Sequence, residues 1–538
     1  MSGPDLRWLL AAYKIMNLFM NVDRRAAGTP LKHFWSVCVG AGRANEGLRA
    51  NWLEQLALAA EHGGFRYCRF HGLFHDDMFV LRPVKGQLQY NWQYVDELFD
   101  RMLALGVRPF VELGFCPREL ASVTDITFWW RGHGSPPKDY GQWADLVEAF
   151  VRHCLHRYGA EEVHQWYFEV WNEPNLDFFF AGTKSQYFEL YRVTVERIKA
   201  IDKSLRVGGP ATSNFVPDDR FDGELEDKSK GITNRVADLG TLNWHGTWIV
   251  DFLAFCVAHQ LPLDFLSTHP YPTDYALDQK GEVTGRSRPV DSTRQDLVWV
   301  RKVIDASAYP NAEIHLTEWS SSPSHRDHTH DHLPAATYIV KCNLESIGLV
   351  DSLAYWTFTD VFEEDGGGPT VFHGGFGLIN FQGLVKPAFH AYRFLHQLGD
   401  EVLVRETGGI VTRDSSTGGL AALFYHYPPE MPSAVPMSMH KPDIASAMQR
   451  LGKPGNIELV WRGLPPGTVV GVETLDLQHG CVVDTWNGLG CPEPPTREQL
   501  VRLREAAWNT RKEEFKVGND GVFIFKREIE PWSLVFVK

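Results

Sequence analysis

The sequence predicts an α/β fold, a (β/α)8 TIM barrel joined to an accessory antiparallel β-sandwich. Between residues 34 and 398, short apolar runs alternate with amphipathic helical stretches, which is typical of β/α units around a parallel sheet. After residue 398 the pattern changes to short alternating runs, which favour antiparallel strands. The length of 538 residues also exceeds what one hydrophobic core usually reaches, so we expect at least two domains.

Eight apolar runs are the strand candidates of the barrel, and eight strands close a barrel of this kind. They are residues 34–39, 65–70, 108–114, 166–171, 205–209, 263–268, 313–317 and 353–358. The helix predicted between the second and third runs covers residues 92–105, where apolar side chains recur at helical spacing. Helices of this kind are expected to form the outer ring of the barrel.

The predicted sandwich contains an inserted helix. Its strand candidates are residues 401–405, 419–426, 457–461, 469–476, 521–525 and 532–537. The helix is expected near residues 496–509, because Thr496 and Gln499 form a capping-box pattern after two prolines. Residues 428–454 lack periodicity and predict a long surface loop or a partly disordered segment. We therefore expect a barrel in 34–398, a sandwich in 399–538, and an N-terminal segment, 1–33, that packs on the sandwich.

Composition excludes several classes of protein. Acidic residues outnumber basic ones by 67 to 53, a formal net charge of −14, so a nucleic-acid partner is not expected. No apolar run approaches the roughly 20 residues of a membrane span, so no membrane partner is expected. The apolar stretch at residues 8–20 is broken by Lys14 and Asn17 and lacks a small-residue cleavage site, which favours a cytoplasmic protein. The eight cysteines are scattered through apolar segments and are expected to be mostly buried free thiols.

Two glutamates stand where predicted strands end. Glu173 follows the fourth apolar run in the segment FEVWNEPN (168–175), and Glu318 follows the seventh in IHLTEWSSSP (314–323). The carboxyl ends of barrel strands share one mouth, so both side chains can reach one centre. Hydrolysis of a glycosidic bond requires such a pair, one carboxylic acid that protonates the leaving oxygen and one carboxylate that attacks. A single acid at a strand end is more often a helix cap or a surface residue, so the hypothesis depends on the pair and its context.

The two segments resemble the acid/base and nucleophile motifs of glycoside hydrolase family 39, which includes β-xylosidases and α-L-iduronidases. Further segments resemble the same family along the whole predicted barrel. They are residues 33–35, 69–72, 76–78, 207–210, 267–271, 355–358, 362–364 and 372–375. An isolated WNEPN could recur by chance, but an ordered set of motifs at the expected strand ends is specific.

The resemblance implies a role for each of several residues. Glu173 is the expected general acid/base and Glu318 the expected nucleophile of a retaining mechanism. Asn172 is expected to bond the 2-hydroxyl of the cleaved sugar. The rest of the implied sugar subsite consists of His71, His269, Tyr271, Trp356, Glu363 and Glu364. For the histidines a structural role is the alternative, for Asn172 a turn, and for the two acids a solvated loop.

Other residues near these motifs carry separate hypotheses. Arg69 lies two residues before His71 and so shares its inward face, from where a guanidinium could hold Glu318 ionised. A histidine-rich segment follows Glu318 and contains His325, His328, His330 and His332. Such segments can bind a metal but are often merely solvated, and hydrolysis by two carboxyl groups needs no metal or other cofactor.

The expected substrate is a xylo-oligosaccharide or another β-xyloside, from whose non-reducing end β-D-xylose is released. We favour it over iduronic acid because Glu363 and Glu364 beside the ring would repel a C5 carboxylate, and no basic residue in the motifs compensates. An α-L-iduronidase-like or other pentosidase activity is the first alternative. A non-catalytic carbohydrate-binding protein is the alternative of another class. The sequence leaves the oligomeric state open between monomer and tetramer.

Overall fold

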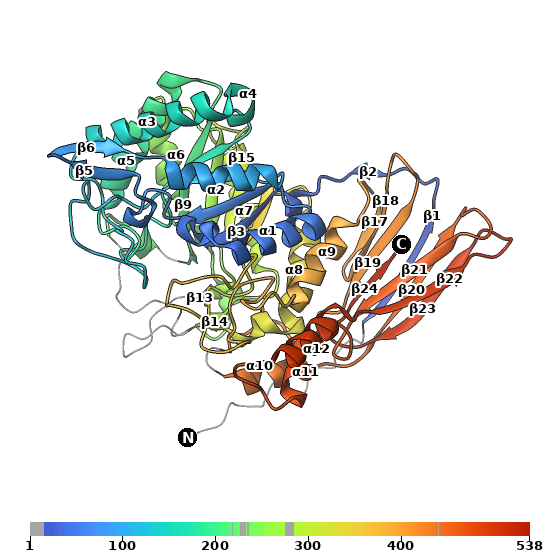
Figure 1. Ribbon diagram of the computed structural model, residues 1–538. Helices are drawn as coiled ribbons and strands as arrows, with labels where there is room; N and C mark the ends of the chain where they lie inside the picture. The colour runs from blue at the N-terminus through green and yellow to red at the C-terminus, as the bar shows by residue number, and fades with distance from the viewer. Residues whose placement is uncertain (1–15, 218, 226–232, 234–235, 275–284, 439–440) are drawn as a thin grey trace.

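The structure is a computed structural model that describes residues 16–217, 219–225, 233, 236–274, 285–438 and 441–538 (Figure 1). Eight parallel strands form a closed barrel. In chain order they are β3 (Cys38–Arg43), β4 (Tyr67–His71), β7 (Arg108–Leu113), β8 (Tyr167–Val170), β9 (Arg206–Ser213), β12 (Phe265–His269), β15 (Glu313–Trp319) and β16 (Ser352–Tyr355). Neighbours in the barrel follow this same order, as in a (β/α)8 barrel, so the predicted fold class is confirmed.

Every barrel strand overlaps its predicted run, with the largest difference at the first one. Residues Phe34–Ser36 form a 3-10 turn (η1), and β3 starts only at Cys38. Phe34 and Trp35 are buried although they lie in a turn. Hydrophobicity alone does not distinguish a buried turn from a buried strand.

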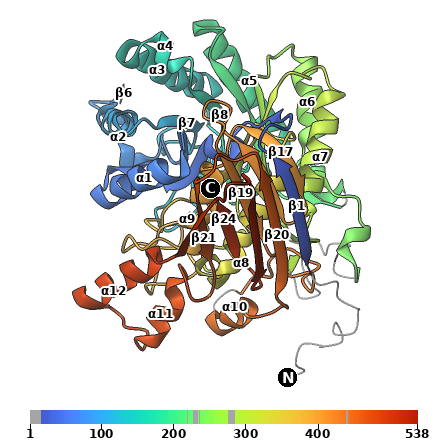
Figure 2. The ribbon, with the colours of Figure 1, turned by 90° about the vertical axis from the view of Figure 1, so that its right-hand side faces the viewer.

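Helices surround the barrel on the outside (Figure 2). They are α1 (Ala50–Gly63), α2 (Gln93–Ala104), α3 (Tyr140–Tyr158), α4 (Ala160–Val163), α5 (Lys184–Ile201), α6 (Ile249–Ala258), α7 (Ser292–Asp305), α8 (Leu333–Glu345) and α9 (Pro387–His396). The predicted helix at 92–105 corresponds to α2, which buries Val95, Leu98, Phe99 and Met102 against the strands. Thr183 caps α5 with the reciprocal bonds of a capping box to Gln186.

An aromatic layer closes the N-terminal end of the barrel. This aromatic layer consists of the rings of Tyr67, Phe110, Tyr167 and Phe265, together with the smaller buried residues Val37, Cys38 and Ala354. The rings of Phe110 and Tyr167 stack at 4.7 Å, and Tyr67 meets Tyr167 edge-on at 5.4 Å. Because this end is filled, a substrate can enter the barrel only from the carboxyl ends of its strands.

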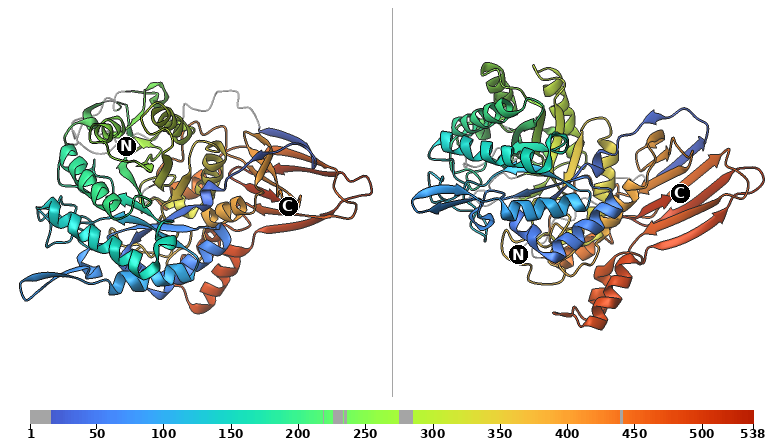
Figure 3. Two further views of the ribbon diagram at one scale, coloured as in Figure 1. Left: turned by 90° about the horizontal axis from the view of Figure 1, so that it is seen from above. Right: turned by 45° about the horizontal axis from the view of Figure 1, so that its top comes forward.

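Two β-sheets lie to one side of the barrel (Figure 3). The larger contains β2 (Thr29–Pro30), β17 (Glu401–Glu406), β18 (Gly409–Arg413), β19 (Leu420–Tyr425), β24 (Leu534–Val537), β21 (Val469–Leu475) and β22 (Arg511–Lys516). The smaller contains β1 (Asn17–Asp23), β20 (Gly455–Arg462) and β23 (Phe523–Ile529). Both chain segments before the barrel thus pair with strands from the C-terminal part of the chain. The domain boundaries at residues 33 and 398 stay predictions.

Alternate residues of β19 and β24 face two different cores. Leu423 and Phe536 belong to the core shared with the barrel, whereas Ala422 and Val535 belong to the core between the two sheets. This is the side-chain alternation of a β-strand with both faces buried. The barrel side of the large sheet is covered by α9, where the rings of Phe394 and Phe536 stack at 5.4 Å.

The C-terminal part contains one expected helix and two that the sequence did not predict. Helix α12 (Arg497–Trp508) begins after Thr496, whose capping box with Gln499 is present. The prediction of a loop throughout 428–454 is wrong, because α10 (Pro442–Met448) buries Ala445 and Met448 there. This helix and α11 (Val482–Gly488) have seven residues each, too few to show a clear helical period.

Two further predictions can be compared with the structure. All eight cysteines are free thiols, and all are buried except Cys491. Among the described residues, no helix is long and apolar enough to cross a membrane.

Candidate active site

The backbone leaves β8 through two strained residues that aim Glu173 into the barrel mouth. Trp171 and Glu173 have φ angles of 73° and 43°, in the left-handed region that non-glycine residues rarely adopt. Two hydrogen bonds hold the turn, from Glu173 N to Ala211 O (2.9 Å) and from Leu176 N to Glu173 O (3.0 Å). Strain of this kind persists only where surrounding contacts fix it, and it is common at functional sites.

A β-bulge presents Glu318 at the same mouth. Between β15 and β16, Leu316 pairs with Leu353 and Trp319 pairs with Tyr355, so three steps on one strand match two on the other. In a regular strand, Thr317 and Glu318 would point to opposite faces. The extra residue re-aims the chain, as bulges at barrel rims do. Both side chains therefore reach the inside of the barrel.

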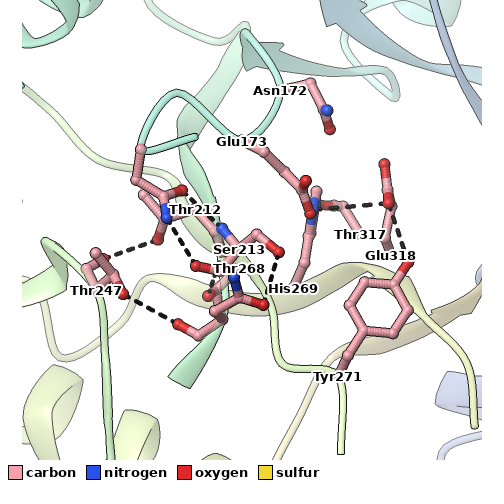
Figure 4. A network of polar contacts seen from close by, with 12 residues as sticks. Asn172, Glu173, Thr212, Ser213, Thr247, Thr268, His269, Tyr271, Thr317 and Glu318 are labelled. Carbon is pink, nitrogen blue, oxygen red and sulfur yellow. Dashed lines mark hydrogen bonds and ion pairs between the residues drawn. The ribbon is translucent and has the colours of Figure 1, made fainter. Parts of the chain in front are cut away.

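The two carboxyl groups face each other across a narrow gap (Figure 4). One oxygen of Glu173, one oxygen of Glu318 and one ring nitrogen of His269 all lie within 4.8 Å of one another. His269 Nδ1 is 2.9 Å from Glu173 Oε1 and 3.8 Å from Glu318 Oε2. Both acids are buried, at 5% exposure each, so few waters screen them from each other.

Arg69 forms a buried ion pair with Glu318 inside the barrel. Its Nη1 donates to Glu318 Oε1 at 2.7 Å, and the side chain is fully buried. Burial alone would lower the pKa of Arg69, but the carboxylates of Glu169, Glu112 and Glu318 raise it above its usual value. The guanidinium therefore stays charged beside the predicted nucleophile. Its position is the one expected from strand parity, and its catalytic role stays a prediction.

The environments of the two acids differ in a way that suits a division of labour. Burial, and then the charge of Glu318, raise the pKa of Glu173 well above its ordinary value. Burial also raises the pKa of Glu318, but the charges of Arg69 and His71 and the hydrogen bond from Arg69 oppose it. As the pair shares its protons, Glu318 ionises first and Glu173 keeps its proton.

His71, Tyr271 and Trp356 surround Glu318 at the barrel mouth. His71 Nε2 is 3.4 Å from Glu318 Oε1, and Tyr271 Oη donates to Glu318 Oε2 at 3.2 Å. The Trp356 ring is buried, with its centroid 4.7 Å from that of His71. An indole ring at this position is suited to stack on a sugar.

Asn172 presents a free donor to the site. Its Oδ1 accepts from Arg69 Nη2 at 2.8 Å, which fixes the orientation of the amide. Its Nδ2 is buried and has no hydrogen-bond partner within the described part of the chain. A buried amide NH₂ without a partner is costly, which is expected where a ligand supplies the acceptor.

Glu363 and Glu364 do not have equal environments. Glu364 Oε1 is 3.9 Å from His71 Nε2, and burial together with the charge of Glu318 raises its pKa well above the usual value. Both oxygens of Glu363 instead accept bonds from Arg49 (2.7 and 2.8 Å), and Arg43 adds a third at 3.0 Å. Burial alone would raise the pKa of Glu363, but these arginines lower it. Two arginines outside the motifs thus compensate the charge of Glu363, so the expected repulsion of a C5 carboxylate does not apply to this residue.

Three buried residues of the site were not singled out from the sequence. Glu112 bonds His71 Nδ1 at 2.6 Å and lies 3.1 Å from Arg69 Nη2, while Glu169 bonds Arg69 Nε at 2.6 Å. Thr317 bonds both Glu169 and His269. The available signal was an acid inside an apolar strand, at 112 and at 169, on the inward parity of its strand.

The side chains of the histidine-rich segment contact neighbouring groups in the part of the chain that the structure describes. His330 contacts Ser320 and the Gly374 carbonyl, and His332 contacts the His328 carbonyl. Among the described residues, no three histidine, cysteine or acidic side chains of this segment converge on one point.

A (β/α)8 barrel with two facing carboxyl groups at the carboxyl ends of its strands has the architecture of a glycosidase. The sequence profile of glycosyl hydrolases family 39 matches residues 18–522. A β-xylosidase of Geobacillus stearothermophilus is 36% identical over 499 residues, which cover 91% of this chain and 89% of that protein. The α-L-iduronidase of Homo sapiens is 25% identical and covers 90% of this chain and 73% of that protein.

Solved structures agree with this grouping. The family 39 enzyme of Xanthomonas axonopodis pv. citri superposes with a TM-score of 0.82 at 34% identity, covering 99% of this chain and 98% of that one. A monomeric β-xylosidase of Caulobacter crescentus CB15 superposes with a TM-score of 0.81 at 33% identity, covering 97% and 99%. The chain therefore belongs to glycosyl hydrolases family 39, and it is a glycosidase.

Proposed function

We propose that the chain is a retaining, exo-acting β-xylosidase that releases β-D-xylose from the non-reducing end of xylo-oligosaccharides. The observation that carries this proposal is the short separation of Glu173 and Glu318: one carboxyl oxygen of each lies within 4.8 Å of the other. Retaining glycosidases keep their carboxyl groups about 5 Å apart, whereas inverting enzymes leave room for a water between them at roughly 6.5–9.5 Å.

In the proposed cycle, Glu318 attacks the anomeric carbon while Glu173 gives its proton to the leaving oxygen. The ionised Glu173 then removes a proton from water, which displaces Glu318 from the anomeric carbon. Esterification of Glu318 removes the negative charge that raises the pKa of Glu173, so Glu173 becomes able to act as a base at that stage. Two displacements retain the anomeric configuration.

The free Nδ2 of Asn172 supports the assignment of a sugar subsite. It is a donor without a partner beside the two acids, where the 2-hydroxyl of a glycosyl group would lie. A hydrogen bond at this hydroxyl strengthens as the ring becomes oxocarbenium-like, so it contributes to the rate of reaction.

The choice of sugar rests on likeness and on charge. Two β-xylosidases, of Geobacillus stearothermophilus and Caldicellulosiruptor saccharolyticus, are 36% and 35% identical to this chain, against 25% for the human α-L-iduronidase. A uronic acid would bring a further carboxyl group beside Glu318 and Glu364, where the raised pKa of Glu364 shows that additional negative charge is disfavoured. Both points favour a neutral pentose. Exo action rests on likeness to the β-xylosidases.

Two measurements test this proposal. Hydrolysis rates of matched 4-nitrophenyl β-xyloside and α-L-iduronide should differ strongly in favour of the xyloside, and a preference for the iduronide would refute the assignment of the sugar. Proton NMR of the first product from xylotriose should show β-xylose and xylobiose. An initial α-anomer would contradict retention, and cleavage inside longer chains would contradict exo action.

A further inference from the structure

Two buried side chains, Glu169 and Thr317, lie behind His269, the residue that contacts the carboxyl group of Glu173. We infer that Glu169 and Thr317 fix His269 in its Nε2–H tautomer, which leaves Nδ1 as an acceptor for the proton of Glu173. Both are positioning residues, because they act through His269. The inference rests on the proposed function, in which Glu173 is the general acid/base.

Glu169 is fixed as an acceptor by Arg69. Its Oε2 receives a hydrogen bond of 2.6 Å from Arg69 Nε, and both side chains are completely buried. A guanidinium is always protonated in proteins and can only donate. A charge-assisted bond of this length favours the ionised carboxylate, which in turn can only accept.

The hydroxyl of Thr317 therefore has only one possible orientation. Thr317 Oγ1 lies 2.7 Å from Glu169 Oε1, and its single proton is donated there. The same oxygen lies 2.9 Å from His269 Nε2. Since the hydroxyl proton is already used, the remaining bond needs a proton on the nitrogen, and His269 must carry it on Nε2.

His269 can then only accept a hydrogen bond at its other nitrogen, Nδ1. Burial, with the nearby positive charges of Arg69 and His71, lowers the pKa of His269 well below its usual value, so the ring is neutral. A neutral imidazole has one N–H, and Nδ1 carries a lone pair. Nδ1 lies 2.9 Å from Glu173 Oε1, a contact that is favourable only when Glu173 donates (Figure 4). This chain of hydrogen bonds from Glu169 through Thr317 and His269, called the relay below, thus stabilises the protonated form of Glu173.

The ionised form of Glu173 would face a lone pair at this distance. After Glu173 has protonated the leaving group, the repulsion favours its return to the acid form, so it takes a proton from the attacking water more readily. The water oxygen then bonds to the anomeric carbon as the bond from this carbon to Glu318 breaks. One proton is lost and regained, and His269 keeps the same tautomer throughout.

Other groups around Glu173 do not replace this contact. The charged or titratable groups that face Glu173 and His269 are Arg69, His71, Glu112, Glu169, Glu318 and Glu364. The Ser213 hydroxyl also bonds Glu173 but favours its ionised form. His269 is thus the described side chain that offers Glu173 Oε1 an acceptor at hydrogen-bond distance.

The first test compares Thr317→Val with the matched control Thr317→Ser, which keeps the hydroxyl. Valine cannot accept from His269, so the ring can move its proton to Nδ1 and donate to an ionised Glu173. We expect the basic limb of kcat/KM for a phenyl β-xyloside to move down by roughly one pH unit in Thr317→Val. Above that limb the rate should fall by about tenfold, while at lower pH it should equal that of Thr317→Ser.

The substrate provides a second control in the same experiment. A 2,4-dinitrophenyl β-xyloside has a leaving group that needs little protonation, so its profile should change far less in Thr317→Val. A loss of equal size at every pH, or on both substrates alike, would show a merely structural role and overturn the inference. A basic limb that is the same in both variants would also overturn it.

Neutron diffraction from crystals of the unmodified protein tests the relay without any variant and without substrate. We expect a deuteron on His269 Nε2 and one on the Glu173 carboxyl group. A deuteron on Nδ1 would overturn the inference even if Thr317→Val fails to fold. If the protein cleaves no xyloside, the proposed function fails, and the position of the deuteron alone then decides on the relay.

Discussion

The two ends of the barrel interior use the same strands for opposite purposes. At the N-terminal end the inward residues of the aromatic layer include Tyr67, Phe110 and Tyr167. Two positions further along the same strands, the inward residues are Arg69, Glu112 and Glu169. Side chains two positions apart on a β-strand point the same way, so both sets lie inside the barrel. The first set is aromatic and fills its end, whereas the second is charged.

The pKa values of two glutamates show what the difference means. At the closed end, burial alone would raise the pKa of Glu313, but His315 and Tyr167 bond it and lower the pKa to about 2. At the open end, burial and Glu318 raise the pKa of Glu173. The first acid adds to the stability of the fold at neutral pH, whereas the raised pKa of the second reduces stability there.

The largest expected effect is on the rate, at the open end. Glu318→Ala removes the proposed nucleophile, so kcat on a phenyl β-xyloside should fall on the order of 10⁴-fold or more. Thermal unfolding should show a protein at least as stable as the original, because a buried, closely paired acid is gone. Rescue by azide with formation of the α-xylosyl azide would confirm the role. Retention of even a tenth of the activity would contradict it.

The next expected effect is on stability, at the closed end. Phe110→Ala leaves a cavity among the rings of the aromatic layer and should cost about 3–5 kcal/mol of unfolding free energy. Urea unfolding followed by fluorescence measures this loss. We expect kcat of the folded protein to stay close to the original, since the substrate does not reach this layer. A large loss of kcat with unchanged stability would break the distinction between the two ends.

A smaller effect on the rate separates the two acids. Glu173→Ala should lower kcat/KM for a phenyl β-xyloside by roughly 10²–10⁴-fold, the contribution of general acid catalysis. The same variant should cleave the 2,4-dinitrophenyl β-xyloside with kcat/KM near that of the unmodified protein, because that leaving group needs no proton. Equal losses on both substrates would assign Glu173 a different role.

The smallest expected effect is a change in pH dependence of opposite sign at the two ends. The contribution of Glu313 is present above its unfolded pKa and is lost as the pH falls from about 4.5 toward 2. Glu313→Gln should therefore lower Tm near pH 6 and have less effect near pH 3. Glu173 has a raised pKa and destabilises the fold as the pH rises, so Glu173→Gln should raise Tm more at pH 8 than at pH 5. The same sign in both variants would contradict the comparison.

The sequence predicts the frame of the site well, because strand ends are a local property. Apolar runs and the motifs that follow them place Glu173 and Glu318 at one mouth, and parity places Arg69 beside His71. Local patterns do not reveal the bulge between Leu316 and Trp319. That one extra residue brings Thr317 inside together with Glu318.

Contacts between distant segments also escape sequence reasoning. Glu363 is neutralised by Arg49, 314 residues away in the chain. No pattern around either residue indicates this pair, because it depends on the closure of the barrel between β16 and β3. The helix α10 was missed for a different reason, since its seven residues are too few to show a clear helical period.

The central claim is that Glu318 forms a covalent bond with the sugar, and a mechanism-based trap tests it most directly. Incubation with 2,4-dinitrophenyl 2-deoxy-2-fluoro-β-xyloside should inactivate the protein and add the mass of one fluoroxylosyl group. Peptide mapping should place that group on Glu318, and Glu318→Ala should remain unlabelled. A label on any other residue, or turnover to the inverted product without labelling, would contradict the account.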